Sequence, residues 1–271
     1  KLPEYDWLHL HHEDFTGQYG KFYRSARYQK WYQEQIEVAE GNASLLGFEK
    51  VSELKLSVAK NIQNFVLGGG FLFTMCSGTD SFDIALAAQN TDICESVFDG
   101  DPSHPNCDHE LDYSKTFAFK DFKLIKDPMV YEYSDIDGTY LRTNRTIPKE
   151  LDEFTLFDFS AKWDVVPTML TQCHQNVIKG FMGQTTDFKK NLIKSSVLIL
   201  GETKAAETAR YIHGEMGQGT WTFYGGHDPE DYQHFVGDPP TDLNLHPNSP
   251  GYRLILNNIL FPAAKKKKRK T

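Results

Sequence analysis

The chain has 271 residues, of which 39% are hydrophobic and 13% aromatic, enough for one large domain or two small ones with a sizeable core. Its formal net charge of −8 is unevenly distributed, because the basic tail KKKKRK at 265–270 leaves 23 basic against 37 acidic residues elsewhere. An acidic body argues against a nucleic-acid-binding surface on the fold, and no apolar run approaches the roughly 20 residues of a membrane span. We interpret the tail as a solvated terminus, with phosphate or anionic-surface binding as the alternative.

The first expected element is a strand over residues 5–12, in which apolar and polar residues alternate. Its carboxyl end delivers His11, His12, Glu13 and Asp14, and open α/β sheets bind ligands at the carboxyl ends of their strands. We therefore expect His11, His12 and Glu13 to contribute to a substrate-binding site. Neighbouring side chains of an extended segment point to opposite faces, so a metal site here would need further ligands from elsewhere.

Two helical segments are expected next, over residues 22–40 and 51–67, and the second is clearly amphipathic. The three glycines at 68–70 can end that helix with positive φ angles. Residues 71–75, FLFTM, are typical of a short strand buried on both faces. With the helix expected after residue 80, the order is βαβα, which favours a parallel sheet with right-handed crossovers.

Cys76 occupies the turn between the strand at 71–75 and the following helix. The turn has the sequence CSGT, and Asp80 or Ser81 is expected to cap the helix. A nucleophile on a strand-to-helix turn lies exposed above the sheet, beside helix N–H groups that can stabilise an anion. Cys76 is therefore the candidate nucleophile, and a purely structural role in a tight turn is the alternative.

An irregular region follows the helix that begins near residue 80. Residues 92–109 are proline-containing and acidic and are expected to form a solvated loop, because the glycine and terminal glutamate of an EF-hand calcium loop are absent. Cys94 and Cys107 flank this loop, so a disulfide between them is one alternative in an oxidising compartment, and two free thiols are the other. Residues 111–170 are interpreted as a β-rich insertion. Its expected strands cover 116–124, 129–133 and 154–159.

Core-like segments return in the last third of the chain. Strands are expected over 177–181 and 197–201, a hairpin turn over 214–219, a strand over 220–224 and a closing helix over 250–261. The predicted organisation is a first part of an α/β core at 1–110, the β-rich insertion at 111–170, a second part of the core at 171–264, and the basic tail at 265–271.

Cysteine hydrolase chemistry needs a thiolate, a base and a carboxylate that orients the base. Cys76 would be the nucleophile and His227 the base, with Asp228 or Glu230 orienting the imidazole ring. His11 and His12 are rival bases, and Gly78, Thr79 and Gly226 are expected to lie against the substrate. The polar residues after Gly226 also suggest a metal site, but their spacing matches no specific zinc signature, so a bound divalent metal is the alternative rather than the prediction.

Two separated motifs resemble the class I glutamine amidotransferase-like superfamily. The turn Thr74-Met75-Cys76-Ser77-Gly78 is similar to its nucleophile elbow, G-x-C-x-G, with threonine in place of the first glycine. The segment GEMGQGTWTFYGGHDPEDY at 214–232 is similar to the ThuA-like branch, where a Gly-x-Gly turn and a strand end in Gly-His-Asp. This resemblance implies a flavodoxin-like open parallel sheet, here carrying a β-rich insertion and lacking its first strands.

Nearly the whole chain also resembles secreted Bacteroidetes proteins that are labelled asparagine synthetase B. That resemblance implies a periplasmic or extracellular location in the cell envelope and an N-terminal segment that this chain lacks. An ATP pyrophosphatase loop has the pattern S-G-G-x-D-S, whose glycines let backbone amides wrap the phosphates. Residues 77–81 read SGTDS, one residue shorter and with one glycine, so the residues argue against ATP-dependent asparagine synthesis.

Three functions are consistent with the sequence. The first is a cysteine-dependent hydrolase or amidotransferase-like enzyme acting on an amide or another small substrate. The second is a non-catalytic binding or assembly subunit of the cell envelope, suggested by the candidate surface aromatics Tyr23, Tyr28, Trp31 and Tyr32. The third is a ThuA-like role in carbohydrate metabolism, which the motif GGHDPE suggests.

Overall fold

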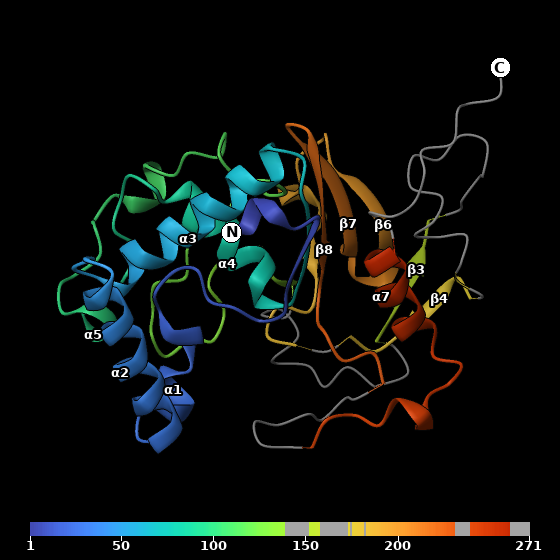
Figure 1. Ribbon diagram of the computed structural model, residues 1–271, viewed down its shortest axis with the longest axis horizontal. Coiled ribbons are helices and arrows are strands. Elements are labelled where there is room, and N and C mark those ends of the chain that lie inside the picture. The colour runs from blue at the N-terminus through green and yellow to red at the C-terminus, as the bar shows by residue number, and fades with distance from the viewer. Residues whose placement is uncertain (139–151, 158–172, 174, 182, 231–238, 261–271) are drawn as a thin grey trace.

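The computed structural model describes residues 1–138, 152–157, 173, 175–181, 183–230 and 239–260 (Figure 1). One curled sheet runs through the described part of the chain, with α3 and α4 against one face and α7 against the other. The helices are α1 (Tyr23–Ala26), α2 (Lys30–Leu45), α3 (Val51–Leu67), α4 (Ser77–Ala87), α5 (Ser96–Asp99) and α7 (Pro250–Leu260). Single 3₁₀ turns lie at Leu2–Glu4, Tyr19–Lys21, Cys107–His109, Lys190–Leu192, Lys204–Ala206 and Leu243–Leu245.

The sheet is mixed. Its strand order is β1 (Trp7–Leu10), β2 (Phe71–Met75), β8 (Gly219–Tyr224), β7 (Thr208–Met216), β6 (Leu198–Thr203), β3 (Glu153–Leu156) and β4 (Val177–Lys179), with β5 (Phe188–Lys189) paired to β7. The first three strands are mutually parallel, with Leu10 opposite Thr74 and Met75 opposite Tyr224. Every other pairing among the described strands is antiparallel.

The predicted flavodoxin-like open parallel sheet is therefore wrong. A parallel pair needs a long crossover connection, whereas antiparallel strands need only a tight turn. Between β2 and β8 the chain makes such tight turns: β7 and β8 are joined at Gly217, and β6 and β7 by the turn at Lys204–Ala206. Among the described strands, β1 and β2 alone are both consecutive along the chain and parallel, and the crossover between them contains α1, α2 and α3.

Two hydrophobic layers cover the two faces of the sheet. On one face, α3 and α4 pack through residues such as Val66 and Phe82 onto Leu72 and Phe223 of the strands. On the other face, Leu254 of α7 packs in a cluster with strand residues that include Phe73 and Tyr224. Strand β2 is buried along its whole length because it contributes side chains to both layers, as the run FLFTM predicted.

Several local predictions can be compared with the structure. The helix of 51–67 and the strand of 71–75 are confirmed to the residue, and Gly69 has the positive φ expected of the glycine turn. Helix α4, however, begins at Ser77 with Cys76 as N-cap, rather than being capped by Asp80 or Ser81. All four cysteines are free, so Cys94 and Cys107 do not form a disulfide in this structure.

The predicted β-rich insertion is described only in part. Residues 116–124 and 129–133 form isolated bridges and turns in place of the expected strands, because loop 117–119 is fixed by the carboxylate of Asp83 rather than by a neighbouring strand. Strand β3 overlaps the expected strand of 154–159 and joins the main sheet through β6. Residues 139–151 and 158–170 lie outside the described residues, so the insertion stays a prediction.

Candidate functional site

Cys76 lies at the carboxyl end of β2, the middle strand of the parallel trio. Its backbone has φ 51° and ψ −139°, a conformation that costs a residue other than glycine roughly 1–3 kcal/mol. The N–H of Cys76 donates to the carbonyl of Tyr224 at 2.9 Å, and its own carbonyl accepts from the N–H of Thr79 at 3.0 Å. Strand pairing on one side and the first turn of α4 on the other therefore fix the strand-to-helix elbow that the sequence predicted.

Gly78 allows α4 to pack closely on the ends of β1 and β2. A Cβ atom at this position would lie 2.7 Å from Oγ1 of Thr74 and 3.4 Å from the carbonyl oxygen of His11. Thr74 stands where the resembled motif has its first glycine, and its side chain fills the space that Gly78 leaves free. The elbow therefore keeps its shape with a single glycine, because only one of the two facing positions carries a side chain.

The sulfur of Cys76 is enclosed by the segment 183–186. The N–H of Gln184 donates to Sγ at 3.1 Å, and a Cβ atom on Gly183 would lie only 2.7 Å from Sγ. Cys76 is 1% exposed, so the prediction that it lies exposed above the sheet is wrong, because Gly183 and Gln184 cover its sulfur. The Gln184 N–H therefore helps to fix the position of the sulfur.

His227 and Asp228 complete a Cys–His–Asp arrangement. Nδ1 of His227 lies 2.6 Å from Oδ2 of Asp228; the ring N–H is not aligned on this oxygen, so the contact is ionic. Burial alone would lower the pKa of His227, but contacts with the Asp228 carboxylate and the Cys76 sulfur outweigh burial and raise the pKa to about 10. These two contacts therefore favour the protonated, imidazolium form of His227.

Two further histidines line the same edge from the end of β1. The ring of His11 lies 4.4 Å from that of His227 between centroids, and His12 lies 5.6 Å from His227. Nδ1 of His11 is 2.6 Å from Nδ1 of His12. Burial, then the positive charges of His227 and His12, lower the pKa of His11 to about 3, so His11 is neutral at physiological pH.

A buried carboxylate holds the segment that touches the sulfur. Asp80, on the first turns of α4, accepts a hydrogen bond from Oγ1 of Thr185 at 2.9 Å. The carbonyl of Thr185 accepts from the N–H of Gly226 at 2.7 Å, immediately before His227. Thr185 therefore links α4, the N–H donor at Gln184 and the turn that carries His227. Burial raises the pKa of Asp80 to about 7.

The other sequence-predicted site residues are placed less directly. Glu230 pairs with His246 at 3.8 Å, and no contact between Glu230 and His227 is found in the described residues, so Asp228 is the carboxylate that the structure brings to the base. Thr79 is fully buried and its hydroxyl donates to the carbonyl of Cys76, which makes it part of the elbow. Glu13 is partly buried near Gly78, and burial raises its pKa.

Gly226 is a tight backbone junction. It has φ 72°, and a Cβ atom there would lie 1.7 Å from the carbonyl oxygen of Phe181. Sequence reasoning missed the residues on the other side of this junction, Gly183, Gln184 and Thr185. Their signal was weak: two glycines, at 180 and 183, in a segment that otherwise resembles the end of a strand.

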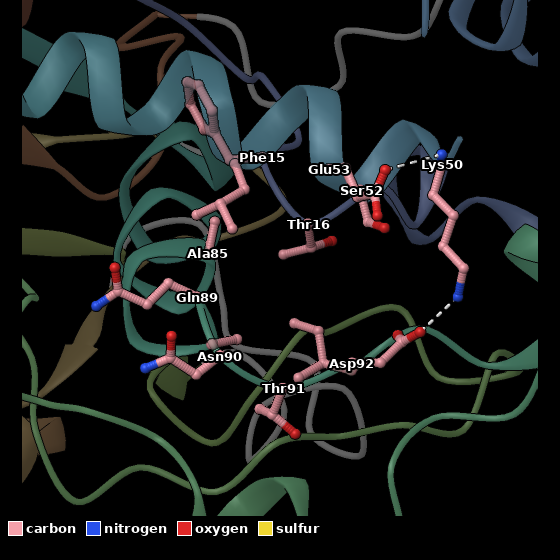
Figure 2. Close-up of a pocket in the computed structure, with 13 residues that line it drawn as sticks. Phe15, Thr16, Lys50, Ser52, Glu53, Ala85, Gln89, Asn90, Thr91 and Asp92 are labelled. Atoms are coloured by element: carbon pink, nitrogen blue, oxygen red, sulfur yellow. Dashed lines mark hydrogen bonds and ion pairs between the residues drawn. The ribbon is translucent and has the colours of Figure 1, made fainter. Parts of the chain in front are cut away.

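A pocket of about 270 Å³ lies apart from the thiol centre, between the start of α3 and the loop after α4 (Figure 2). Its lining includes Thr16, Ser52 and Asp92 but none of the Cys–His–Asp residues. At its rim, Nζ of Lys50 lies 2.6 Å from Asp92 and 3.2 Å from Asp99. The ammonium group therefore already occupies the acidic cluster that these aspartates form.

Comparison with known proteins gives little further guidance. No family model matches the chain, and no curated protein matches it. Among solved structures, the cytoplasmic protein STM3548 from Salmonella typhimurium matches with 12% identity and a TM-score of 0.40, covering 96% of this chain and 72% of that one. A similarity at this level supports no conclusion about activity. In the described part of the chain, no helix is long and apolar enough to cross a membrane.

Proposed function

We propose that the protein is a cysteine-dependent hydrolase or amidotransferase-like enzyme that acts on an amide or another small carbonyl substrate. One observation carries the proposal: Cys76, on a strained strand-to-helix turn, contacts His227, which in turn pairs with Asp228. Nucleophile, base and orienting carboxylate in this order are the parts that acyl transfer through a thioester requires.

In the proposed reaction, the Cys76 thiolate attacks the substrate carbonyl carbon and forms a C–S bond. The negative charge that develops on oxygen would be stabilised by the N–H groups of Ser77 and Gly78, which donate to no acceptor in the described part of the chain. His227 gives its proton to the leaving amine as the C–N bond breaks, leaving a thioester. Water then attacks the thioester, His227 takes the proton from that water, and the acid and the thiolate are released.

Selective alkylation tests this proposal. Native protein is treated with iodoacetamide, and the modification of each cysteine is followed by peptide mass spectrometry. Cys76 is expected to react faster than Cys94 and Cys107, because burial raises the pKa of both of those thiols. Replacing His227 by glutamine should slow the reaction of Cys76 at least tenfold, whereas removing the partly exposed Cys173 should leave the rate at Cys76 unchanged.

Turnover is tested with p-nitrophenyl acetate, whose activated acyl group reveals a nucleophile without knowledge of the natural substrate. A burst of nitrophenolate equal to the protein concentration, with acetyl found on Cys76, supports the proposal. If the burst persists in Cys76→Ser, or if Cys76 is modified no faster than Cys94 under native conditions, the proposal is wrong.

A second candidate function is a non-catalytic assembly subunit, and surface aromatic residues favour it. Tyr28 is 86% exposed and Trp31 36% exposed at the start of α2, whereas Tyr32 is buried at 1% and cannot contribute to an interface. Light scattering of the native protein tests this alternative: a stable complex that Tyr28→Ala and Trp31→Ala disrupt would support it, and a monomer with a reactive Cys76 would exclude it. The location in the cell envelope and the ThuA-like role stay predictions.

A further inference from the structure

Two segments that each lacked enough ligands for a metal site meet in the structure. His11 follows β1 and His227 follows β8, and both strands are parallel to β2, so their carboxyl ends lie at one edge of the sheet. One ligand atom each from His11, His227 and Asp228 lies within 4.8 Å of the others. Neither segment alone supplies the set, because His11 comes from the end of β1 while His227 and Asp228 follow β8.

The three donors suit a zinc-class cation. Two imidazole nitrogens and one carboxylate oxygen form a ligand set found in zinc sites, whereas Mg²⁺ and Ca²⁺ prefer oxygen donors alone. Ligand atoms of a tetrahedral zinc lie roughly 3.3 Å apart, given metal–nitrogen bonds of about 2.0–2.1 Å. The donor atoms lie within 4.8 Å of one another, so they would close by at most about 1.5 Å when the cation binds.

His12 holds His11 in a suitable orientation. A metal-ligating histidine usually donates its other ring N–H to a neighbour, which fixes both the ring and the tautomer. Nδ1 of His11 lies 2.6 Å from Nδ1 of His12. When His11 donates its Nδ1–H to Nδ1 of a neutral His12, the lone pair of His11 lies on Nε2, where a cation can bind. His12 is therefore a positioning residue for the ligand His11.

We propose that Zn²⁺ or a similar cation binds across His11, His227 and Asp228 and reversibly switches off the thiol centre at Cys76. The switching half rests on the proposed function, whereas the binding half does not. The bound cation coordinates the imidazole nitrogen of His227 and the carboxylate of Asp228, which would otherwise act as base and orienting group for Cys76. The proton displaced from His227 passes to solvent. Cys76 contacts His227 and therefore loses its base when the cation binds.

Metal binding is measured first, without reference to reactivity. The native protein is titrated with Zn²⁺ by calorimetry, and with Co²⁺ as a spectroscopic substitute. One equivalent is expected to bind. His11→Ala should weaken binding at least tenfold and His12→Ala about tenfold. His104→Ala is the matched control, because His104 also pairs with a carboxylate, Glu110, at 2.9 Å, and should leave affinity unchanged.

Protection of Cys76 is measured second, as the rate of iodoacetamide modification with and without Zn²⁺. The cation should slow modification at least tenfold in the native protein, and EDTA should restore the rate. In His11→Ala, the rates with and without Zn²⁺ should be equal, whatever the metal-free rate of that variant. Protection that survives His11→Ala, or binding that His11→Ala and His104→Ala weaken equally, overturns the inference.

The two proposals fail in distinguishable ways. If Zn²⁺ binds with the expected dependence on His11 but Cys76 is unreactive in the metal-free protein, the site stands and the proposed hydrolase fails. If Cys76 is selectively reactive and Zn²⁺ neither binds nor protects, the hydrolase proposal stands and the metal site fails.

Discussion

Gly183→Ala directly tests how the segment 183–186 encloses the sulfur. The added methyl group would lie 2.7 Å from Sγ of Cys76, 3.0 Å from Cα of Gly226 and 3.1 Å from Cδ2 of His227. Cβ atoms in proteins are essentially never closer than 3.0 Å to a non-bonded heavy atom, so either the sulfur or the segment 183–186 must move. Overpacking of this kind costs about 1–3 kcal/mol. The displacement also separates Sγ from the Gln184 N–H and from His227.

The expected result is a folded protein whose Cys76 reacts with iodoacetamide about 10–100-fold more slowly, because small misplacements of reacting groups have effects of this size. Unfolding in urea reports the stability and peptide mapping the rate. Gly41→Ala is the matched control: no heavy atom lies within 4 Å of its Cβ position in α2, so it should stabilise the protein by about 0.5–1 kcal/mol and leave the rate unchanged. A Gly183→Ala protein that reacts at the native rate refutes the enclosure.

Three further predictions concern the elements beneath the site. Because Cys76 has a positive φ, Cys76→Gly should be more stable than Cys76→Ala by about 1–3 kcal/mol in urea unfolding. Asp83→Asn should cost about 3–5 kcal/mol, since the carboxylate accepts three backbone N–H groups from residues 117–119 and an amide cannot accept them all; a loss below 1 kcal/mol would contradict this role. Burial raises the pKa of Asp80 to about 7, so the folded state binds the proton more tightly and the unfolding free energy should fall between about pH 4 and pH 7, by up to roughly 4 kcal/mol. Asp80→Asn keeps an acceptor for Thr185 and should flatten that decline. If the pH profile of this variant matches that of the native protein, Asp80 is not the group responsible.

The sequence predicted the elements around Cys76 better than the sheet that contains them. Helix 51–67 is amphipathic, strand 71–75 is a continuous apolar run, and the glycines at 68–70 separate them, so local pattern suffices for both. Strand direction depends instead on connections. The hairpin turn expected at 214–219 was already incompatible with an all-parallel sheet, because a tight turn joins antiparallel strands only. The fold prediction followed the resemblance to the amidotransferase-like superfamily instead of this hairpin, and it was wrong for that reason.

The sequence identified candidate catalytic residues but not the groups that they contact in the folded protein. Cys76, His227 and Asp228 were identified because strand ends carry them, and strand ends are visible in a sequence. The role of Glu230 could not be decided, since Pro229 lies between it and His227 and the path of the chain beyond a proline depends on tertiary packing. Gln184 acts through its backbone N–H, for which any residue type would serve, so no side-chain pattern could reveal it.

The mixed sheet still brings the predicted site residues together, although its topology differs from the predicted parallel sheet. His11, Cys76 and His227 meet if the carboxyl ends of β1, β2 and β8 lie at one edge, and these three strands are parallel in the structure. Antiparallel β7 then shields the far side of β8, and its buried Arg210 binds the carbonyl of Gly180 in the segment that leads to Gly183. The antiparallel half therefore supports the wall that encloses the sulfur, so that weakening the contact between Arg210 and Gly180 should lower the reactivity of Cys76 without touching the Cys–His–Asp residues themselves.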